Sequence, residues 1–89
     1  MKLDQLRVLR AVVEAGSVKP AAESLHRTQP AVSQALKALE VQTGTEPFDR
    51  FGSRLELTPV GRRVYLQSLQ VLSEVEDLNQ LVRLFDKGH

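Results

Sequence analysis

The stretch from Thr28 to Lys37 carries hydrogen-bonding side chains and one cation but no carboxylate. Gln29 and Gln34 each present an amide, which donates and accepts hydrogen bonds at once and so matches N6 and N7 of adenine. The hydroxyls of Thr28 and Ser33 suit phosphate oxygens, and the Lys37 ammonium adds a positive charge. This set of groups favours contact with the major groove of DNA. The alternative is an ordinary solvated helix surface.

Residue combinations typical of enzymes and metal sites are missing from the sequence. The chain has no cysteine, and its two histidines, His26 and His89, lie far apart, so a zinc site lacks ligands. No pair of carboxylates, no nucleophile beside a base and no glycine-rich phosphate loop occurs. We therefore predict that the protein is not an enzyme and holds no metal or other cofactor. For His26 we expect a structural role, with its ring bonded to the backbone.

The side chains of the first stretch need a helix to align them. We predict a helix over residues 28–43, with Thr28 or Gln29 as its N-cap, Pro30 in its first turn and its end near Gly44. Its apolar side chains fall within one arc of about 100°. They are Val32, Ala35, Leu36 and Leu39. A separate arc of about 140° carries Gln29, Pro30, Ser33, Gln34 and Lys37. The first arc is expected to face the core, and the second faces solvent or a partner.

Two further helices are predicted before this one. Residues 3–16 have an amphipathic pattern, and Gly16 is placed to cap the C-terminus of the helix. The apolar residues of that pattern are Leu6, Leu9, Val12 and Val13. Ser17 can cap a short helix over residues 18–25, whose inner face is Ala21, Ala22 and Leu25. Only a tight turn fits between this helix and the next, so the two form a helix-turn-helix pair, packed through Ala22, Leu25, Val32 and Leu36.

A change of period after the third helix predicts a two-stranded hairpin, or wing, over residues 48–57. Gly52 and Ser53 form the turn signal, and Arg54 stands beside the tip. There Arg54 can enter a minor groove or touch phosphate; the alternative is a residue that only aids solubility. Thr58 as N-cap and Pro59 at the first helical position then open a final helix of roughly 27 residues, ending near Asp86.

The predicted fold is therefore mostly α: a winged helix-turn-helix of three helices and a two-stranded wing, with a long C-terminal helix appended. We assign residues 1–58 to a DNA-binding domain and residues 59–89 to a linker and dimerisation helix. The chain is expected to bind double-stranded DNA sequence-specifically, with helix 28–43 in the major groove and the wing on the minor groove or the backbone. The alternative function is a winged-helix protein-interaction module that does not bind DNA.

The last helix carries a heptad-like apolar stripe, in which Val64, Val71, Leu78 and Phe85 recur every seven residues. Val75 and Val82 interleave, Ser68 is the polar exception, and Leu72 and Leu81 widen the stripe. The part near Val64 and Leu69 is expected to pack on the first helix. The residues predicted to form a homodimer are Val71, Val75, Leu78, Leu81, Val82 and Phe85. The alternative is that the helix frays and the stripe is only intramolecular core.

Composition sets the broad class. The net charge is only +1, yet residues 19–63 hold seven basic and five acidic side chains, and residues 64–89 hold two and four. A basic middle is consistent with an anionic partner. The N-terminus is charged throughout, so it is not a signal peptide, and no apolar run approaches the ~20 residues of a membrane span. We expect a soluble, cytoplasmic protein without membrane contact.

The segment from Leu9 to Gly61 resembles the DNA-binding domain of LysR-type transcriptional regulators, which are bacterial. The matching motifs are Glu14-Ala15-Gly16-Ser17, Ala21-Ala22, Leu25-His26, Thr28-Gln29-Pro30-Ala31-Val32-Ser33, Leu39-Glu40, Phe48-Asp49-Arg50, and Leu57-Thr58 followed by Gly61. With the long helix included, the resemblance covers essentially the whole chain. It implies DNA binding as dimers or tetramers, and an effector-binding domain that is absent from this chain.

The resemblance also implies roles for single residues. Those expected near bases or nearby phosphates are Gln29, Pro30, Ser33 and Gln34. Thr28, Lys37 and Thr58 would lie on the DNA backbone, and Arg54 would be the wing contact. Arg27 departs from the family pattern, where a small apolar residue is typical; it either adds a phosphate contact or loosens the turn. Gln34 stands where an arginine is common, and Pro47 where a leucine is.

Overall fold

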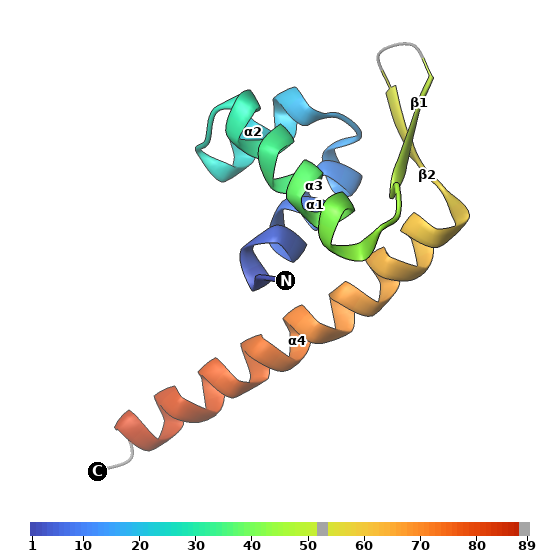
Figure 1. Cartoon of the computed structure of the whole chain (residues 1–89). Helices are drawn as coiled ribbons and strands as arrows, with labels where there is room; N and C mark the ends of the chain where they lie inside the picture. Colours follow the sequence, from blue (N-terminus) through green and yellow to red (C-terminus); the bar gives the residue numbers. More distant parts are fainter. Residues whose placement is uncertain (52–53, 88–89) are drawn as a thin grey trace.

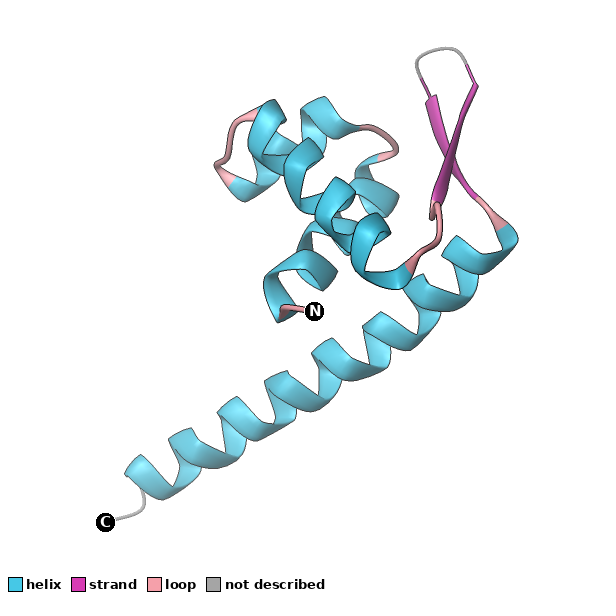
Figure 2. Ribbon diagram, in the orientation of Figure 1, coloured by secondary structure: helices cyan, strands magenta, loops and turns pink. Residues whose placement is uncertain are grey.

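The computed structural model describes residues 1–51 and 54–87, together with their side chains except those of residues 50, 51, 54 and 87. Three short helices form a compact group: α1 (Leu3–Ala15), α2 (Val18–Leu25) and α3 (Gln29–Thr43). A hairpin of β1 (Phe48–Phe51) and β2 (Arg54–Leu57) follows, and α4 (Pro59–Lys87) completes the chain. The hairpin stands beside α3, and α4 runs under the group and projects beyond it (Figure 1). The predicted order of elements is confirmed, as is the mostly helical winged fold (Figure 2).

Local sequence signals account for most helix ends. Gly16 and Gly44 end α1 and α3 in the left-handed region, at φ 85° and 67°, which glycine adopts without steric cost. The Thr28 hydroxyl accepts the Ala31 N–H at 3.3 Å and caps α3, as predicted. Ser17 occupies the predicted N-cap position of α2, with the extended backbone usual for such a residue, but its side chain makes no capping hydrogen bond. That part of the prediction was wrong.

The turn between α2 and α3 depends on the backbone of His26. This residue has φ 55°, in the left-handed region that non-glycine residues seldom adopt. The turn is closed by the His26 N–H to the Glu23 carbonyl at 3.2 Å and the Arg27 N–H to the Ala22 carbonyl at 2.9 Å. The His26 ring is exposed and forms no hydrogen bond with the described residues. Its role is structural, as expected, but through its backbone and not through the ring bond we predicted.

The core lies where the first three helices meet the near half of α4. Its buried apolar residues are Leu6, Val8, Leu9, Val12, Ala21, Ala22, Val32, Leu36, Leu39 and Leu72. Ala21 and Ala22 are small, which lets α2 lie close to its neighbours. Leu25 is half-buried against the same cluster, so the predicted packing of α2 on α3 is confirmed. Gln5 is also buried; its side chain accepts the Lys2 backbone N–H at 3.1 Å, which removes the cost of burying the amide oxygen.

The hairpin is antiparallel, with Phe48 opposite Leu57 and Arg50 opposite Leu55. Because side chains alternate along a strand, Phe48, Leu55 and Leu57 share one face. That face is turned inward: Phe48 and Leu55 pack against the core cluster. The predicted turn residues Gly52 and Ser53 lie outside the described residues.

The long helix α4 divides into two unlike halves. Val64, Tyr65, Val71 and Leu72 of the near half pack on the core, so this half is part of the domain. Leu72, which we placed in the stripe, is a core residue. Beyond Val75 every described side chain is exposed, and this half projects from the domain (Figure 1). No helix in the described part of the chain is long and apolar enough to cross a membrane.

Candidate nucleic-acid interface

The outer face of α3 is open to solvent along its length. Gln29, Pro30, Ser33, Gln34 and Lys37 are all exposed, as are Thr28 before them and Ala31 between them. Val32, Leu36 and Leu39 of the other arc are buried. The predicted division of this helix into a core arc and a polar arc is therefore confirmed. The polar arc carries amides, hydroxyls and an ammonium.

The N-terminal end of α3 is suited to an anion. The Thr28 hydroxyl accepts the Ala31 N–H, so its own hydrogen remains available to a further acceptor. The helix dipole places partial positive charge at this end, and no acidic residue occupies the first turn. A phosphate oxygen next to Thr28 would therefore meet a hydroxyl donor and a favourable field.

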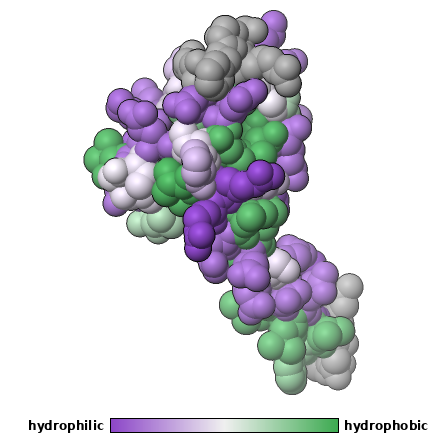
Figure 3. Space-filling view, turned by 90° about the vertical axis from the view of Figure 1, so that its right-hand side faces the viewer, coloured by the Kyte–Doolittle hydropathy of each residue, from purple (hydrophilic) through white to green (hydrophobic). Residues whose placement is uncertain are grey.

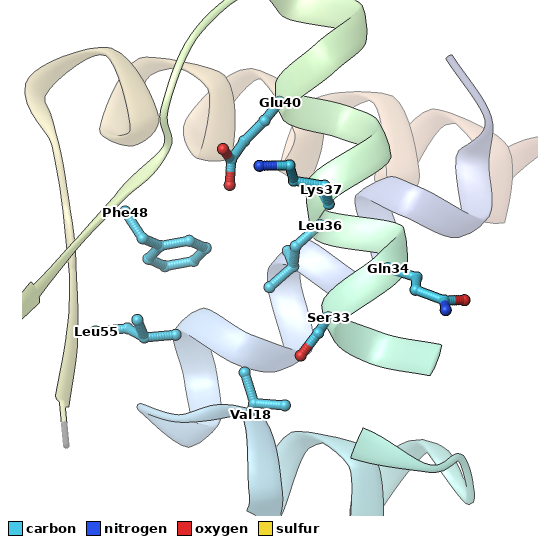
Figure 4. Close-up of a pocket in the computed structure, with 8 residues that line it drawn as sticks. All are labelled: Val18, Ser33, Gln34, Leu36, Lys37, Glu40, Phe48 and Leu55. Carbon is cyan, nitrogen blue, oxygen red and sulfur yellow. The ribbon is translucent and has the colours of Figure 1, made fainter. Parts of the chain in front are cut away.

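A groove of about 440 Å³ separates α3 from the wing. Val18 of α2, Leu36 of α3, and Phe48 and Leu55 of the wing supply its apolar lining, and Ser33, Gln34, Lys37 and Glu40 of α3 its polar lining. Figure 4 shows Ser33 and Leu36 directed into the hollow and Gln34 directed away from it. The polar face of α3 therefore has two sides. The side with Ser33 faces the wing, and the side with Gln34 faces away from it.

Five lining residues of this groove were not among our predicted site residues: Val18, Leu36, Glu40, Phe48 and Leu55, of which Leu36 was predicted only as a core residue. The sequence marked Phe48 and Leu55 only as hairpin residues, and Val18 only as the start of a helix. Tertiary packing brings Val18 and the wing residues next to α3. No pattern of neighbouring residues in the sequence indicates such contacts.

Arg54, the predicted wing contact, is the first residue of β2. Its backbone therefore stands on the wing near the turn, as the sequence predicted. Its side chain lies outside the described part of the structure.

Thr58 is committed to interactions within the domain. Its hydroxyl donates to the Glu46 carbonyl at 2.7 Å and accepts the Gly61 N–H at 3.0 Å. A threonine hydroxyl has one hydrogen, so none remains for a phosphate oxygen. The predicted N-cap role of Thr58 is confirmed. Its implied place on the DNA backbone finds no support in this geometry.

Arg27 is held by a carboxylate to which no sequence pattern pointed. Its guanidinium donates two hydrogen bonds to Asp4 of α1, at 2.8 and 2.6 Å. This bonding, with the accompanying charge attraction, lowers the pKa of the Asp4 carboxyl. The pair ties the first turn of α1 to the turn before α3. Arg27 therefore braces the turn and does not loosen it, and the phosphate contact stays a prediction.

Tyr65 is half-buried and packs against the core cluster. Arg62 and Arg63 at the start of α4 are exposed.

The projecting half of α4 presents an apolar surface. The exposed fractions are 59% for Leu78, 50% for Leu81, 55% for Val82, 69% for Leu84 and 77% for Phe85. Figure 3 shows apolar residues gathered on this end of the molecule. Of the remaining predicted dimerisation residues, Val75 is half-buried and Val71 is half-buried against the core. Leu84 had not been predicted.

The near end of the stripe, Val64 and Leu69, lies against the domain. Val64 packs on the core cluster. Leu69 is half-buried and lines a hollow of about 310 Å³ that is shared with Arg7 and Arg10 of α1.

Comparison with known proteins places this arrangement in context. The family described as "Bacterial regulatory helix-turn-helix protein, lysR family" matches residues 3–62. An uncharacterized HTH-type transcriptional regulator of Azotobacter vinelandii is 44% identical over 77 residues, which cover 86% of this chain and 54% of that protein. The RuBisCO operon transcriptional regulator of Allochromatium vinosum is 38% identical over 91 residues, covering 99% of this chain and 30% of that protein. The chain thus spans about half the length of the first relative and under a third of the second.

Two solved structures match closely. The chain in the crystal structure of a BenM_DBD complex with catB site 1 DNA has a TM-score of 0.94 and 31% identity, with all of both chains covered. The chain in the crystal structure of a CbnR_DBD–DNA complex has a TM-score of 0.90 and 29% identity, with 98% of this chain and 100% of that chain covered.

Proposed function

The chain belongs to the LysR family of bacterial regulatory helix-turn-helix proteins, and from this premise we propose that it binds double-stranded DNA sequence-specifically to regulate transcription. It is a regulator and not an enzyme. The observation that carries the proposal is the exposed, hydrogen-bonding face of α3, presented by a fold that matches those of chains solved with DNA.

We place α3 in the major groove. Gln29 and Gln34 are positioned to read base edges, with Ser33 and Pro30 beside them, because these side chains share the exposed arc. Thr28 and Lys37 then lie at the phosphates, where a hydroxyl donor and an ammonium are effective. The wing, with Arg54, follows the minor groove or the backbone. We leave Thr58 out of this contact set because its only hydrogen is donated to Glu46.

We propose that residues 1–58, supported by the near half of α4, read the DNA, and that within residues 59–89 the projecting half of α4 joins two copies. The support is the projecting apolar surface of α4, since a patch of this kind on a small domain usually marks an association surface. An antiparallel pair centred near Leu78 fits the charges. It brings Arg83 of each helix toward the acidic Glu74 to Asp77 region of the other. One DNA-reading domain then lies at each end of the paired helices, facing successive major grooves.

We further propose that the protein acts in the cytoplasm, where a bacterial regulator meets its chromosomal DNA. The described helices give no membrane span that would argue otherwise.

Selection from random duplex DNA, followed by titration of the selected sequence at several salt concentrations, tests the proposal. We expect one enriched sequence, bound more tightly than random duplex, and affinity that falls as salt rises because phosphate contacts release counterions. A folded protein that shows no binding to any duplex at tens of micromolar would contradict the proposal. It would favour the winged-helix protein-interaction module instead.

A further inference from the structure

The first turn of α4 lies directly against the residues that lead into the wing. The Thr58 backbone N–H donates to the Pro47 carbonyl at 3.0 Å, and the Thr58 hydroxyl donates to the Glu46 carbonyl at 2.7 Å. The same hydroxyl accepts the Gly61 N–H at 3.0 Å. The segment before β1 and the segment after β2 are therefore joined at the base of the hairpin. We call Glu46, Pro47, Thr58 and Gly61 the wing latch.

Gly61 makes this close approach possible. A Cβ atom on Gly61 would lie 2.7 Å from the carbonyl carbon of Pro47, 2.8 Å from its Cα, and nearer still to its carbonyl oxygen. These are backbone atoms, so no rotamer change can relieve the overlap. Gly16 and Gly44 differ, because they need glycine for their left-handed φ and have open space around them. At Gly61 the requirement is room for Pro47, which is itself buried.

The latch sets one wall of the groove beside α3. Phe48 begins β1 directly after Pro47, and with Leu55 it forms the wing side of the groove (Figure 4). The other side is α3 itself, which is fixed in the core through Val32, Leu36 and Leu39. Moving Pro47 relative to α4 therefore moves the wing wall while α3 stays in place.

We infer that Gly61 is a positioning residue for DNA recognition: by letting α4 lie on Pro47, it sets the wing at the spacing from α3 that allows both to contact DNA at once. This inference rests on the proposed function. It also gives α4 a second role. The helix proposed to join two copies is the one that holds the wing, so the wing direction is fixed relative to the helix pair.

The test compares Gly61→Ala with Val60→Ala, a control in the same turn whose side chain is exposed. Both variants and the wild type are footprinted with hydroxyl radicals on the selected operator, and binding is titrated against salt. We expect Gly61→Ala to lose protection at the flanks touched by the wing while the major-groove positions keep their base preference. The salt slope should fall by about one for every phosphate that the wing no longer touches. Val60→Ala should match the wild type.

A second variant keeps the inference testable if Gly61→Ala does not fold. Thr58→Val removes both hydrogen bonds of the hydroxyl, keeps the side-chain shape and leaves the backbone bond to Pro47 in place. It should weaken the same flank protections in part. An unchanged footprint in a folded Gly61→Ala overturns the inference, as does a proportional loss of all protections in both variants. A wild type that binds no duplex refutes the proposed function, a result separate from either.

Discussion

Replacing Leu78 with alanine should weaken dimerisation through α4 while each protomer stays folded. Leu78 lies at the centre of the projecting apolar surface and is 59% exposed in the single chain. Complete burial of a leucine side chain contributes about 1.5–3 kcal/mol. The newly buried share is therefore about 0.9–1.8 kcal/mol for each copy by that measure, or about 1.8–3.5 kcal/mol for the dimer. That corresponds to a roughly 20–300-fold increase in the dimer dissociation constant.

Sedimentation equilibrium over a range of concentrations measures that constant directly. Leu66→Ala is the matched control, because Leu66 is also on α4 and 54% exposed but lies outside the stripe. Its dissociation constant should equal that of the wild type. Equal constants for the two variants would contradict the placement of Leu78 in the interface. A wild type that stays monomeric at tens of micromolar would refute dimerisation of this chain through α4.

Three further predictions concern single residues. Gln29→Ala should weaken binding to the selected operator by about 1–3 kcal/mol and relax the preference at one base pair; equal weakening on random duplex would assign Gln29 to the backbone. Lys37→Ala should lower affinity on every sequence and reduce the salt slope by about one, and an unchanged slope would remove Lys37 from the interface. Asp4→Asn should lower the melting temperature slightly at neutral pH by releasing Arg27. The pKa of Asp4 is below its ordinary value of 3.8 in the folded chain, so the contribution of the pair is present above that pH and is lost as the pH falls through the folded-state pKa. The melting difference between wild type and Asp4→Asn should therefore vanish in acid, and a difference independent of pH would contradict this account.

Features determined by neighbours in the chain were predictable from the sequence. The ends of α1 and α3 follow from Gly16 and Gly44, because a glycine adopts the left-handed conformation that ends a helix without help from distant residues. The inner and outer arcs of α3 follow from helical spacing, and Thr28 caps the helix because its hydroxyl lies three residues before the N–H that it accepts.

Features determined by packing between distant segments were not predictable. Asp4 and Arg27 are 23 residues apart, and they meet only because α1 lies beside the turn before α3. The hydroxyl of Thr58 is free for phosphate as far as the sequence shows, and only the fold brings the Glu46 carbonyl next to it. Gly61 could be recognised as part of a family motif. The physical need for glycine there, the close approach of Pro47, depends on how α4 packs against the base of the wing.

The two unlike halves of α4 have a consequence for how association depends on protein concentration. Residues 78–86 are all exposed and belong to no part of the core, and the last turns of a helix without tertiary packing are only marginally stable in water. We expect the end of this segment to fray in a free protomer and pairing with a second copy to hold it helical. Folding of the segment and association are then one linked equilibrium, in which the ordering entropy opposes pairing. Helix content measured by circular dichroism should rise with concentration, and the number of DNA-competent pairs should respond to the amount of protein in the cell.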